Sequence, residues 1–321
     1  MSHIHVGIDI SKDSFNAAYR DAESKWHEES FKNTVAGRRK LLRWAGTNAH
    51  FTMEATGYYH NETALFLQKV STVHVCNPMV VKRYSQLRLN RGKTDRADAR
   101  LIAEFARNNE DMLRVWRPLE GRLGEARALL TVAKQIKKQI QQTANAIHAL
   151  KLTEAGKLAA ELLKPLQQTQ KKALAEVERK LTKIVKTEHK AMYNAIVSIP
   201  GVGDKTASAL IVCTNGFVDF ENPKQLCAYV GLSPRVFESG TSVKGKGHIC
   251  KLGNPYLRQC LYMCAVSAMT CNPVMKAFKE SLVARKKQNT VALVAVANKL
   301  LRTVFALAKK NQRWNPEVKA A

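Results

Sequence analysis

Four acidic side chains, Asp9, Glu54, Asp95 and Asp98, have the spacing of a metal-binding site. They stand out because Lys and Arg together number 52 against 26 Asp and Glu, a formal net charge of +26. Mg²⁺ prefers hard carboxylate oxygens and usually shares its remaining positions with water and substrate phosphate. A basic chain that keeps these acids is suited to phosphodiester chemistry with one or two Mg²⁺ ions.

The elements predicted around the acids bring them to one edge of a sheet. Residues 4–10 alternate with period two, which predicts a strand with Asp9 on the face opposite its isoleucines. Asp95 and Asp98 project from one side of the first turn of a helix predicted over 94–107. Between them the pattern predicts extended segments at 14–19, 30–33, 50–54 and 73–76 and helices at 37–44 and 59–67. This order is typical of the RNase H and RuvC type of nuclease fold.

Each acid taken singly also has an ordinary structural explanation. Asp9 could end a strand, Glu54 could precede a turn at Gly57, Asp95 could begin a helix, and Asp98 could pair with a neighbouring arginine. The occurrence of all four in the expected order favours the metal site.

The rest of the chain is predicted to be mainly helical. A long basic helix begins near Leu129, and Pro165 should break or kink it. The apolar positions 174, 177, 181 and 184 then follow heptad spacing, which hints at a helical hairpin or a coiled-coil association. We therefore predict an α/β plus α protein with three parts: a mixed-sheet domain at 1–127, a helical coiled-coil segment at 128–190, and a mostly helical domain at 191–321.

Two local signals mark the third part. Residues 198–203, Ser-Ile-Pro-Gly-Val-Gly, resemble a helix-hairpin-helix, in which Gly201 and Gly203 free backbone N–H groups to meet a phosphate. Asn254 and Pro255 have the pattern of the N-cap and first residue of a helix running to about Thr270.

The composition favours nucleic acid as the partner. A sequence pI near 9.9 is typical of proteins that neutralise phosphates. No unbroken apolar run of about 20 residues appears, and the best candidate, 291–308, is interrupted by polar residues, so we expect a buried helix and no membrane. Seven cysteines without a CxxC pair and the lack of a signal peptide predict a reducing bacterial cytoplasm, with association to the nucleoid.

Six motifs resemble those of one known family, the transposases and recombinases of the insertion-sequence-110 family, which includes the Piv and MooV invertases. They cover essentially the whole chain, and in order they are Gly-Ile-Asp-Ile-Ser-Lys from 7, Met-Glu-Ala-Thr-Gly-Tyr-Tyr from 53, Lys-Thr-Asp-Arg-Ala-Asp-Ala-Arg from 93, Ser-Ile-Pro-Gly-Val-Gly from 198, Tyr-Val-Gly-Leu-Ser-Pro-Arg from 229 and Glu-Ser-Gly-Thr-Ser-Val-Lys-Gly from 238.

The resemblance implies a role for one serine. It assigns Ser239 as a nucleophile that forms a covalent phosphoserine link to DNA, which would store the phosphodiester bond for rejoining. Ser242 is the natural alternative, Ser233 before Pro234 has a structural explanation, and His248 has no evident partner for proton transfer. Lys244, Lys246, His248, Lys251 and Arg258 follow Ser239 and could neutralise the scissile phosphate. Elsewhere in the chain, Arg91, Lys93 and Lys205 are further candidates for binding nucleic acid.

The resemblance also implies an architecture and partners. It implies a RuvC-like domain joined by a coiled coil to a serine-bearing transposase domain. It further implies dimers, and tetramers on DNA in which one protomer's carboxylates complete another's serine site. A structured noncoding bridge RNA would pair with donor and target double-stranded DNA, so that the protein holds backbones while the RNA reads sequence.

Three functions remain open on the sequence. The leading hypothesis is a Mg²⁺-dependent serine recombinase of an insertion element. The alternative is a hydrolytic endonuclease or Holliday junction resolvase that uses the four acids with water. A nonenzymatic nucleic-acid scaffold is disfavoured because the acids are intact.

Overall fold

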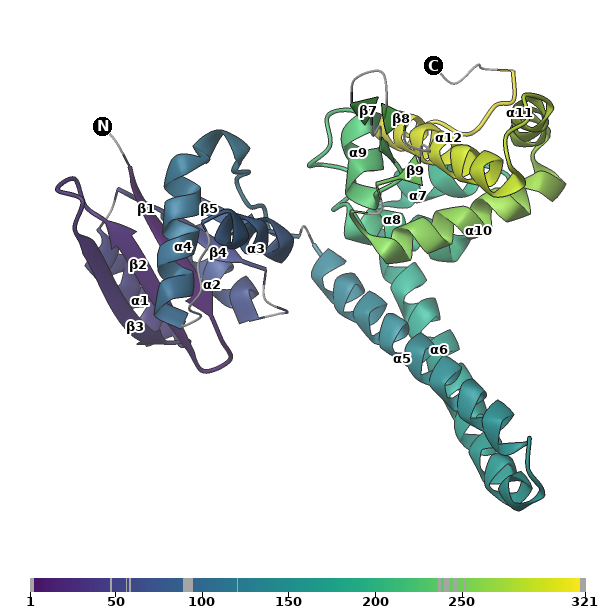
Figure 1. Ribbon diagram of the computed structural model, residues 1–321, viewed down its shortest axis with the longest axis horizontal. Coiled ribbons are helices and arrows are strands. Elements are labelled where there is room, and N and C mark those ends of the chain that lie inside the picture. Colours follow the sequence, from purple (N-terminus) through teal and green to yellow (C-terminus); the bar gives the residue numbers. More distant parts are fainter. Residues whose placement is uncertain are drawn as a thin grey trace. The chain divides into compact units, whose positions relative to one another are not determined.

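The computed structural model describes residues 3–46, 48–55, 57, 59–88, 95–119, 121–235, 238–239, 243–244, 248–250 and 252–317, with backbone alone for 235, 238–239, 243–244 and 248. The chain forms two compact units, Met1–Pro118 and Leu119–Ala321. The three-part division expected from sequence remains a prediction. Figure 1 labels the elements of each unit.

The first unit is built on a five-stranded mixed sheet in the order β3-β2-β1-β4-β5. Strands β1 (Ile4–Ile10), β2 (Ser14–Arg20) and β3 (Trp26–Lys32) form an antiparallel meander. Strands β4 (Ala49–Glu54) and β5 (Val73–Cys76) continue the sheet parallel to β1. The predicted mixed sheet flanked by helices is therefore confirmed, although β3 begins earlier than the extended segment expected at 30–33.

Helices cover both faces of this sheet (Figure 1). The isoleucine face of β1 packs with α1 (Val35–Ala45) and α2 (Tyr59–Leu67) around Phe51 and Met53, which are fully buried. The opposite face is covered by α4 (Asp95–Asn108), which α3 (Pro78–Leu87) flanks. A short 3₁₀ turn, η1 (Glu110–Met112), follows α4.

The second unit begins with a long antiparallel helical hairpin. Helix α5 (Leu123–Leu150) packs along α6 (Lys157–Glu188), and the turn between them contains the 3₁₀ segment η2 (Glu154–Gly156). Figure 1 shows the hairpin extending from the rest of this unit. The predicted break of the long helix at Pro165 is wrong, because α6 runs through it, and the alternative of a kink there stays a prediction. Pro165 is exposed, so water can solvate the carbonyl that loses its N–H partner.

The remainder of the second unit is mostly helical. Helix α12 fills its centre and packs against α7, α9, α10 and α11. By length and composition α12 could cross a membrane, but half of its apolar stretch is buried inside the unit, as expected for a core helix. The elements after the hairpin are α7 (Lys190–Val197), α8 (Asp204–Cys213), α9 (Pro223–Val230), β6 (Pro234–Arg235), β7 (Glu238–Ser239), β8 (Val243–Lys244), β9 (His248–Ile249), α10 (Pro255–Cys271), α11 (Pro273–Ala284) and α12 (Asn289–Lys310).

Candidate active site

Two of the four acids stand on neighbouring parallel strands at the same edge of the sheet. Ile8 of β1 is the partner of Met53 in β4, so Asp9 and Glu54 each follow a paired residue at the carboxyl ends of their strands. Strand residues alternate between faces, which places both acids on the face that α4 covers. Both are partly exposed, as ligands of a metal open to substrate need to be.

Helix α4 lies directly against this face because β1 contains a glycine. A Cβ atom built on Gly7 would stand 2.2 Å from Ala103 N and 2.2 Å from Ala99 O, so the helix backbone touches the strand. Glu110, just beyond the helix C-terminus, is 3.8 Å from His5 at the start of β1. The helix therefore runs opposite to β1, with its N-terminus toward Asp9.

Because α4 runs opposite to β1, its acids Asp95 and Asp98 lie on the same side of the Gly7 contact as Asp9 and at a similar distance along the strand. Asp98 precedes the contact at Ala103 by five residues, about 7.5 Å at 1.5 Å per helical residue. Asp9 follows Gly7 by two residues, roughly 6.6 Å along a strand. Asp95 lies three residues before Asp98, on the same side of the helix. The structure thus collects all four predicted acids at one edge.

The donor chemistry of this edge fits Mg²⁺. The four acids offer carboxylate oxygens, the ligands that a hard divalent ion prefers. The neighbouring Cys76 thiol is a soft ligand, which Mg²⁺ does not prefer. Burial raises its pKa to about 11, with a further contribution from the charge of Glu54.

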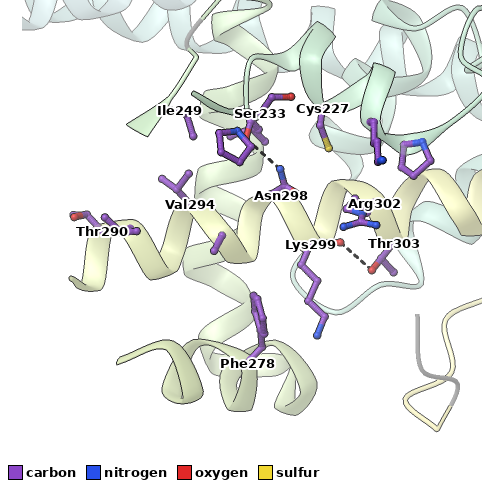
Figure 2. Close-up of a pocket in the computed structure, with 16 residues that line it drawn as sticks. Cys227, Ser233, Ile249, Phe278, Thr290, Val294, Asn298, Lys299, Arg302 and Thr303 are labelled. Carbon is purple, nitrogen blue, oxygen red and sulfur yellow. Dashed lines mark hydrogen bonds between the residues drawn. The ribbon is translucent and has the colours of Figure 1, made fainter. Parts of the chain in front are cut away.

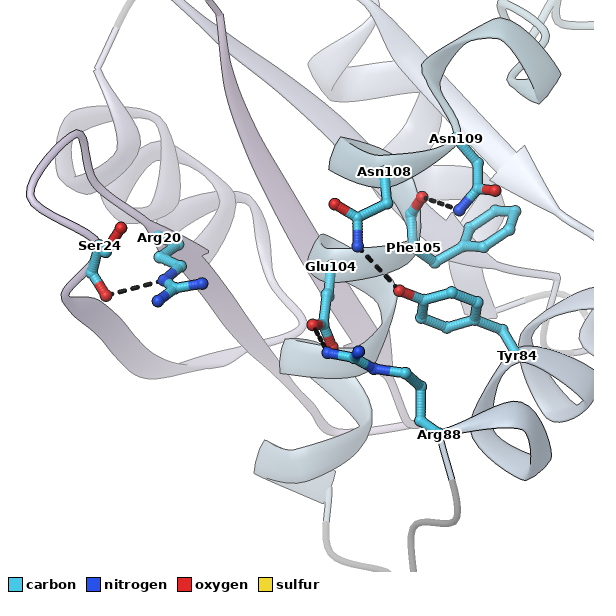
Figure 3. A network of polar contacts seen from close by, with 8 residues as sticks. All are labelled: Arg20, Ser24, Tyr84, Arg88, Glu104, Phe105, Asn108 and Asn109. Carbon is cyan, nitrogen blue, oxygen red and sulfur yellow. Dashed lines mark hydrogen bonds and ion pairs between the residues drawn. The ribbon is translucent and has the colours of Figure 1, made fainter.

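A polar network holds the helix that carries Asp95 and Asp98 (Figure 3). Arg88 at the end of α3 forms an ion pair with Glu104 of α4. One turn further on, Asn108 donates a hydrogen bond to the Tyr84 hydroxyl, with 3.0 Å between Nδ2 and Oη. These contacts fix α4 against α3.

A small cationic cavity adjoins the same helix. It has a volume of about 380 Å³ and is lined by Arg20, Trp26, Arg88 and Arg100 among others. The Arg100 guanidinium lies 5.6 Å from the Trp26 ring centre and is ion-paired with Glu28. Arg20 and Trp26 are not predicted from sequence, because they lie on strands that carry none of the four acids.

Ser239 belongs to the second unit, where it ends a short strand. Its strand β7 pairs antiparallel with β8, with Ser239 opposite Val243, and β6 pairs with β9. Lys244 and His248 lie in β8 and β9. The other predicted residues of this region and of the first unit's basic segment lie outside the described residues: Arg91, Lys93, Ser242, Lys246 and Lys251.

A mainly apolar cavity of about 1040 Å³ is lined by residues of the strand pair β6 and β9 (Figure 2). Pro234 of β6 and Ile249 of β9 line it together with residues of α9, α11 and α12. Asn298 of α12 donates a hydrogen bond to the Leu232 carbonyl at 3.1 Å, which ties the start of β6 to the core helix. Ser233, between them, also lines the cavity.

The helix-hairpin-helix pattern is built from α7, a tight turn and α8. Gly201 has φ +96°, and a Cβ there would stand 2.9 Å from the Ala268 backbone, so this glycine is needed for packing. Gly203 is the N-cap of α8, and a Cβ there would meet nothing within 4 Å. The turn thus leaves open space at Gly203, where a phosphate could approach the helix N-terminus.

A basic groove, defined here by Arg179, Lys183, Lys186, Lys190 and Lys205, runs beside that turn. It has a volume of about 950 Å³, and Asp204, Glu178 and three further residues complete its lining. Of its cations, the sequence analysis identified Lys205 alone. The others recur at spacings of four, three and four, a helical pattern that could have revealed them. Arg179, Lys183 and Lys186 lie on α6, and Lys190 begins α7.

The side chain of Arg258 makes a hydrogen bond within the second unit. Its Nη1 donates a hydrogen bond to the Val230 carbonyl at 2.9 Å, next to Gly231, which has φ +80° at the end of α9. This bond satisfies one of the last carbonyls of α9. Its assignment to nucleic-acid binding stays a prediction.

A mixed sheet with these acids at one edge is the framework of an RNase H-like domain of the four-acid type, which works with divalent metal ions. Sequence comparison agrees. Residues 6–155 match the family model named DEDD_Tnp_IS110 and described as "Transposase", and residues 193–280 match the model described as "Transposase IS116/IS110/IS902 family". The chain belongs to the IS110/IS116/IS902 family of transposases, enzymes that act on DNA, and the suspected family is confirmed.

Relatives match almost end to end. The pilin gene-inverting protein of Moraxella bovis is 25% identical over 333 residues, covering 99% of each chain. The transposase for insertion sequence element IS1111A of Coxiella burnetii is 27% identical over 345 residues, covering 96% of this chain and 90% of that one. A probable family 20 transposase of Pseudomonas aeruginosa is 26% identical over 357 residues, covering 98% and 100%.

Proposed function

We propose that this transposase cuts and rejoins DNA through a phosphoserine intermediate at Ser239, with Asp9, Glu54, Asp95 and Asp98 as ligands of one or two Mg²⁺ ions. The observation that carries the proposal is the collection of four carboxylates at one sheet edge by the Gly7 contact. A strand pair bearing a serine in the other unit supports the second half.

The covalent step conserves the phosphodiester bond. The Ser239 oxygen would attack phosphorus, a new P–O bond would form to serine, and the bond to the deoxyribose oxygen would break. The serine proton would end on the released deoxyribose hydroxyl, directly or through a base. Attack by the hydroxyl of another strand would reverse these changes and regenerate serine, so no external energy source is needed.

The carboxylates have a separate task. Mg²⁺ held there would polarise the phosphate and stabilise charge on the attacking and leaving oxygens. The four acids would hold the Mg²⁺ charge in place. The contact between α4 and Gly7 fixes the spacing of the acids. The RuvC-like fold and the coiled-coil hairpin of α5 and α6 would hold the two chemical groups within an assembly.

Recombination is favoured over hydrolysis by the likeness to one relative. A protein that inverts a pilin gene must rejoin the strands it cuts, and this chain matches such a protein along nearly its whole length. A water-using endonuclease or junction resolvase would leave cut ends. That alternative predicts a dispensable Ser239.

Recombination assays on serine variants distinguish recombination through a phosphoserine from hydrolysis by water. Ser239→Ala should bind nucleic acid normally and lose recombination by at least about 10³-fold, as expected when a nucleophile is removed. Ser242→Ala is the matched control and should keep activity. Normal recombination by Ser239→Ala with loss in Ser242→Ala would move the role to Ser242, and normal recombination by both would remove the nucleophile role from both serines. Cleavage that leaves unjoined ends in the wild type and in both variants would favour hydrolysis.

The proposed partners are double-stranded DNA and a structured guide RNA, held by a dimer that forms a tetramer on DNA. The net charge of +26 and the basic groove support polyanion binding on this scale. Purification from cells carrying the flanking DNA, followed by sequencing of bound RNA, tests the guide. A single structured species encoded beside the gene is expected, and bulk cellular RNA would contradict it.

A further inference from the structure

Several histidines lie on the same face of the sheet as the carboxylates, at the other end of the strands. His5 of β1 is the partner of His50 in β4, and His74 of β5 lies on the same face. The His50 and His74 ring centres are 6.1 Å apart, and those of His5 and His50 are 6.0 Å apart. Glu110, after the C-terminus of α4, reaches the same cluster.

Three side chains of the cluster have converging metal-binding atoms. Each of His3, His50 and Glu110 offers one ligand atom, and these three atoms lie within 4.8 Å of one another. The His3 and His50 rings are stacked with centres 3.9 Å apart. His3 and Glu110 are exposed and can move, while His50 is half-buried and fixed in β4.

Two ring nitrogens here are buried without a hydrogen-bond partner among the described residues. They are His5 Nδ1 and His50 Nδ1, and the His5 side chain is 9% exposed. Buried polar atoms are nearly always paired, so unpaired nitrogens make the cluster a candidate ligand site, and His50 is also one of the three converging side chains. The adjacent His74 donates from Nδ1 to the Arg114 carbonyl, 3.0 Å away, and a histidine held in this way can bind metal through its other nitrogen.

We propose that His3, His50 and Glu110 bind a Zn²⁺ ion at a structural site separate from the carboxylate edge. Two imidazoles and one carboxylate suit zinc, whereas Mg²⁺ prefers oxygen ligands alone. Zinc bonds near 2.0–2.1 Å place tetrahedral ligand atoms roughly 3.4 Å apart, so the ligand atoms, which lie within 4.8 Å of one another, must close in by up to about 1.4 Å. Water takes the fourth position, with His5 beside the Glu110 carboxylate.

The site would add a metal link between three segments that already pack around β1. His3 precedes β1, His50 lies in β4, and Glu110 follows α4. A bound ion would fasten the C-terminal end of α4 to the sheet. The inference rests on this geometry and is independent of the proposed recombination.

The test uses the full chain without a histidine tag, stripped of metal and titrated with Zn²⁺ by calorimetry, with elemental analysis of the dialysed complex. One tightly bound ion per chain and a melting temperature raised by several degrees are expected. His50→Ala should weaken binding more than about 10-fold. His3→Ala and Glu110→Gln, at exposed positions, should do the same without risk to folding.

Two controls define the site. His148→Ala removes an exposed imidazole from α5, and Asp9→Asn alters the carboxylate edge; both should keep the bound ion. Zinc binding that is unchanged in all three cluster variants, or that is absent from the wild-type chain, would overturn the proposal. Loss of the ion in Asp9→Asn with retention in Glu110→Gln would assign it to the carboxylates instead.

Discussion

At the scale of single residues, Gly7 sets the distance between helix α4 and the sheet. The helix backbone occupies the space that any side chain at this position would need. Asp98 and Asp95 lie on that helix, so their approach to Asp9 depends on the missing Cβ. A glycine two residues before a strand carboxylate therefore belongs to the candidate metal site as a positioning residue.

We expect Gly7→Ala to displace α4 and misplace the acids that it carries. Overpacking against backbone costs about 1–3 kcal/mol or more, so the first unit should lose stability and metal-dependent DNA cleavage should fall by at least about 10²-fold. Thermal unfolding and a cleavage assay measure both effects. Gly124→Ala on α5, where a Cβ meets nothing within 4 Å, is the matched control. Full cleavage by Gly7→Ala would contradict the close-approach argument.

Single-atom changes in the acids test the metal site directly. Asp9→Asn and Asp98→Asn keep side-chain size but remove the charge that binds Mg²⁺, so cleavage should be abolished while nucleic-acid affinity stays within about twofold. Cleavage at the wild-type rate by either variant would remove that residue from the site. Excess Mg²⁺ or Mn²⁺ in the assay shows whether weakened metal affinity is the cause.

At the scale of elements, asparagine followed by proline marks the start of four helices. Asn77, Asn222, Asn254 and Asn272 each accept a hydrogen bond from a backbone N–H two or three residues on, and a proline follows each. Only the start of α10 is predicted above from this signal, although the same pair of residues begins α3, α9 and α11. The signal is local, so all four of these starts can be predicted from sequence.

The turn of the helical hairpin shows the opposite case. The proline at 165 predicts a break that does not occur, and α6 begins instead right after Gly156, where a Cβ would meet the Leu150 carbonyl at 2.2 Å. The penalty for a helical proline depends on whether its surroundings can solvate the freed carbonyl. That exposure is a property of the fold and cannot be read from the local sequence.

Glu178 on α6 connects three helices and makes their packing pH-dependent. It pairs with Lys137 of α5 at 2.9 Å and with Lys205 of α8 at 2.7 Å, and its side chain is 13% exposed. Burial alone would raise its pKa, but the bonds to Lys205 and Lys137 lower it below the ordinary value. The resulting stabilisation is present above the unfolded pKa, about 4.3, and is lost as pH falls through the folded value.

Glu178→Gln should therefore destabilise the second unit by roughly 1–3 kcal/mol at pH 7. Thermal unfolding of the variant and the wild type at several pH values is the measurement, and the difference should shrink below about pH 4. Glu176→Gln, which breaks a solvent-exposed pair with Arg179, should leave the stability nearly unchanged. A pH-independent difference for Glu178→Gln would show that lost packing, not charge, is responsible.

At the scale of the whole molecule, the excess of cations predicts strongly salt-dependent binding. Each phosphate that the protein no longer neutralises should reduce the slope of log affinity against log salt by about 0.9 for duplex DNA. Lys183→Ala with Lys186→Ala in the basic groove should lower that slope by up to about 2, while Lys276→Ala on α11, outside the groove, should leave it unchanged. Equal slopes for wild type and double variant would exclude the groove from DNA contact.

Long-range arrangement sets the limit of what the sequence predicts. Period-two alternation places Asp9 on a strand, and the i, i+3 spacing places Asp95 and Asp98 on one side of a helix. The order of these elements, typical of one fold, then predicts that the acids meet. The histidine cluster was missed because His5, His50 and His74 lie on strands whose alignment emerges from the sheet register. Trp26 and Arg100 meet for the same reason, across β3 and α4.

The central claim is that Ser239 bonds covalently to DNA, and trapping that bond tests it most directly. The wild-type protein, with its co-purified RNA and Mg²⁺, is incubated with a nicked substrate that cannot be rejoined, and the adduct is digested and mapped by mass spectrometry. The account predicts a phosphodiester-linked nucleotide on the peptide carrying Ser239, absent from Ser239→Ala and from Asp9→Asn. Cleaved DNA without any protein adduct would contradict the account and establish attack by water.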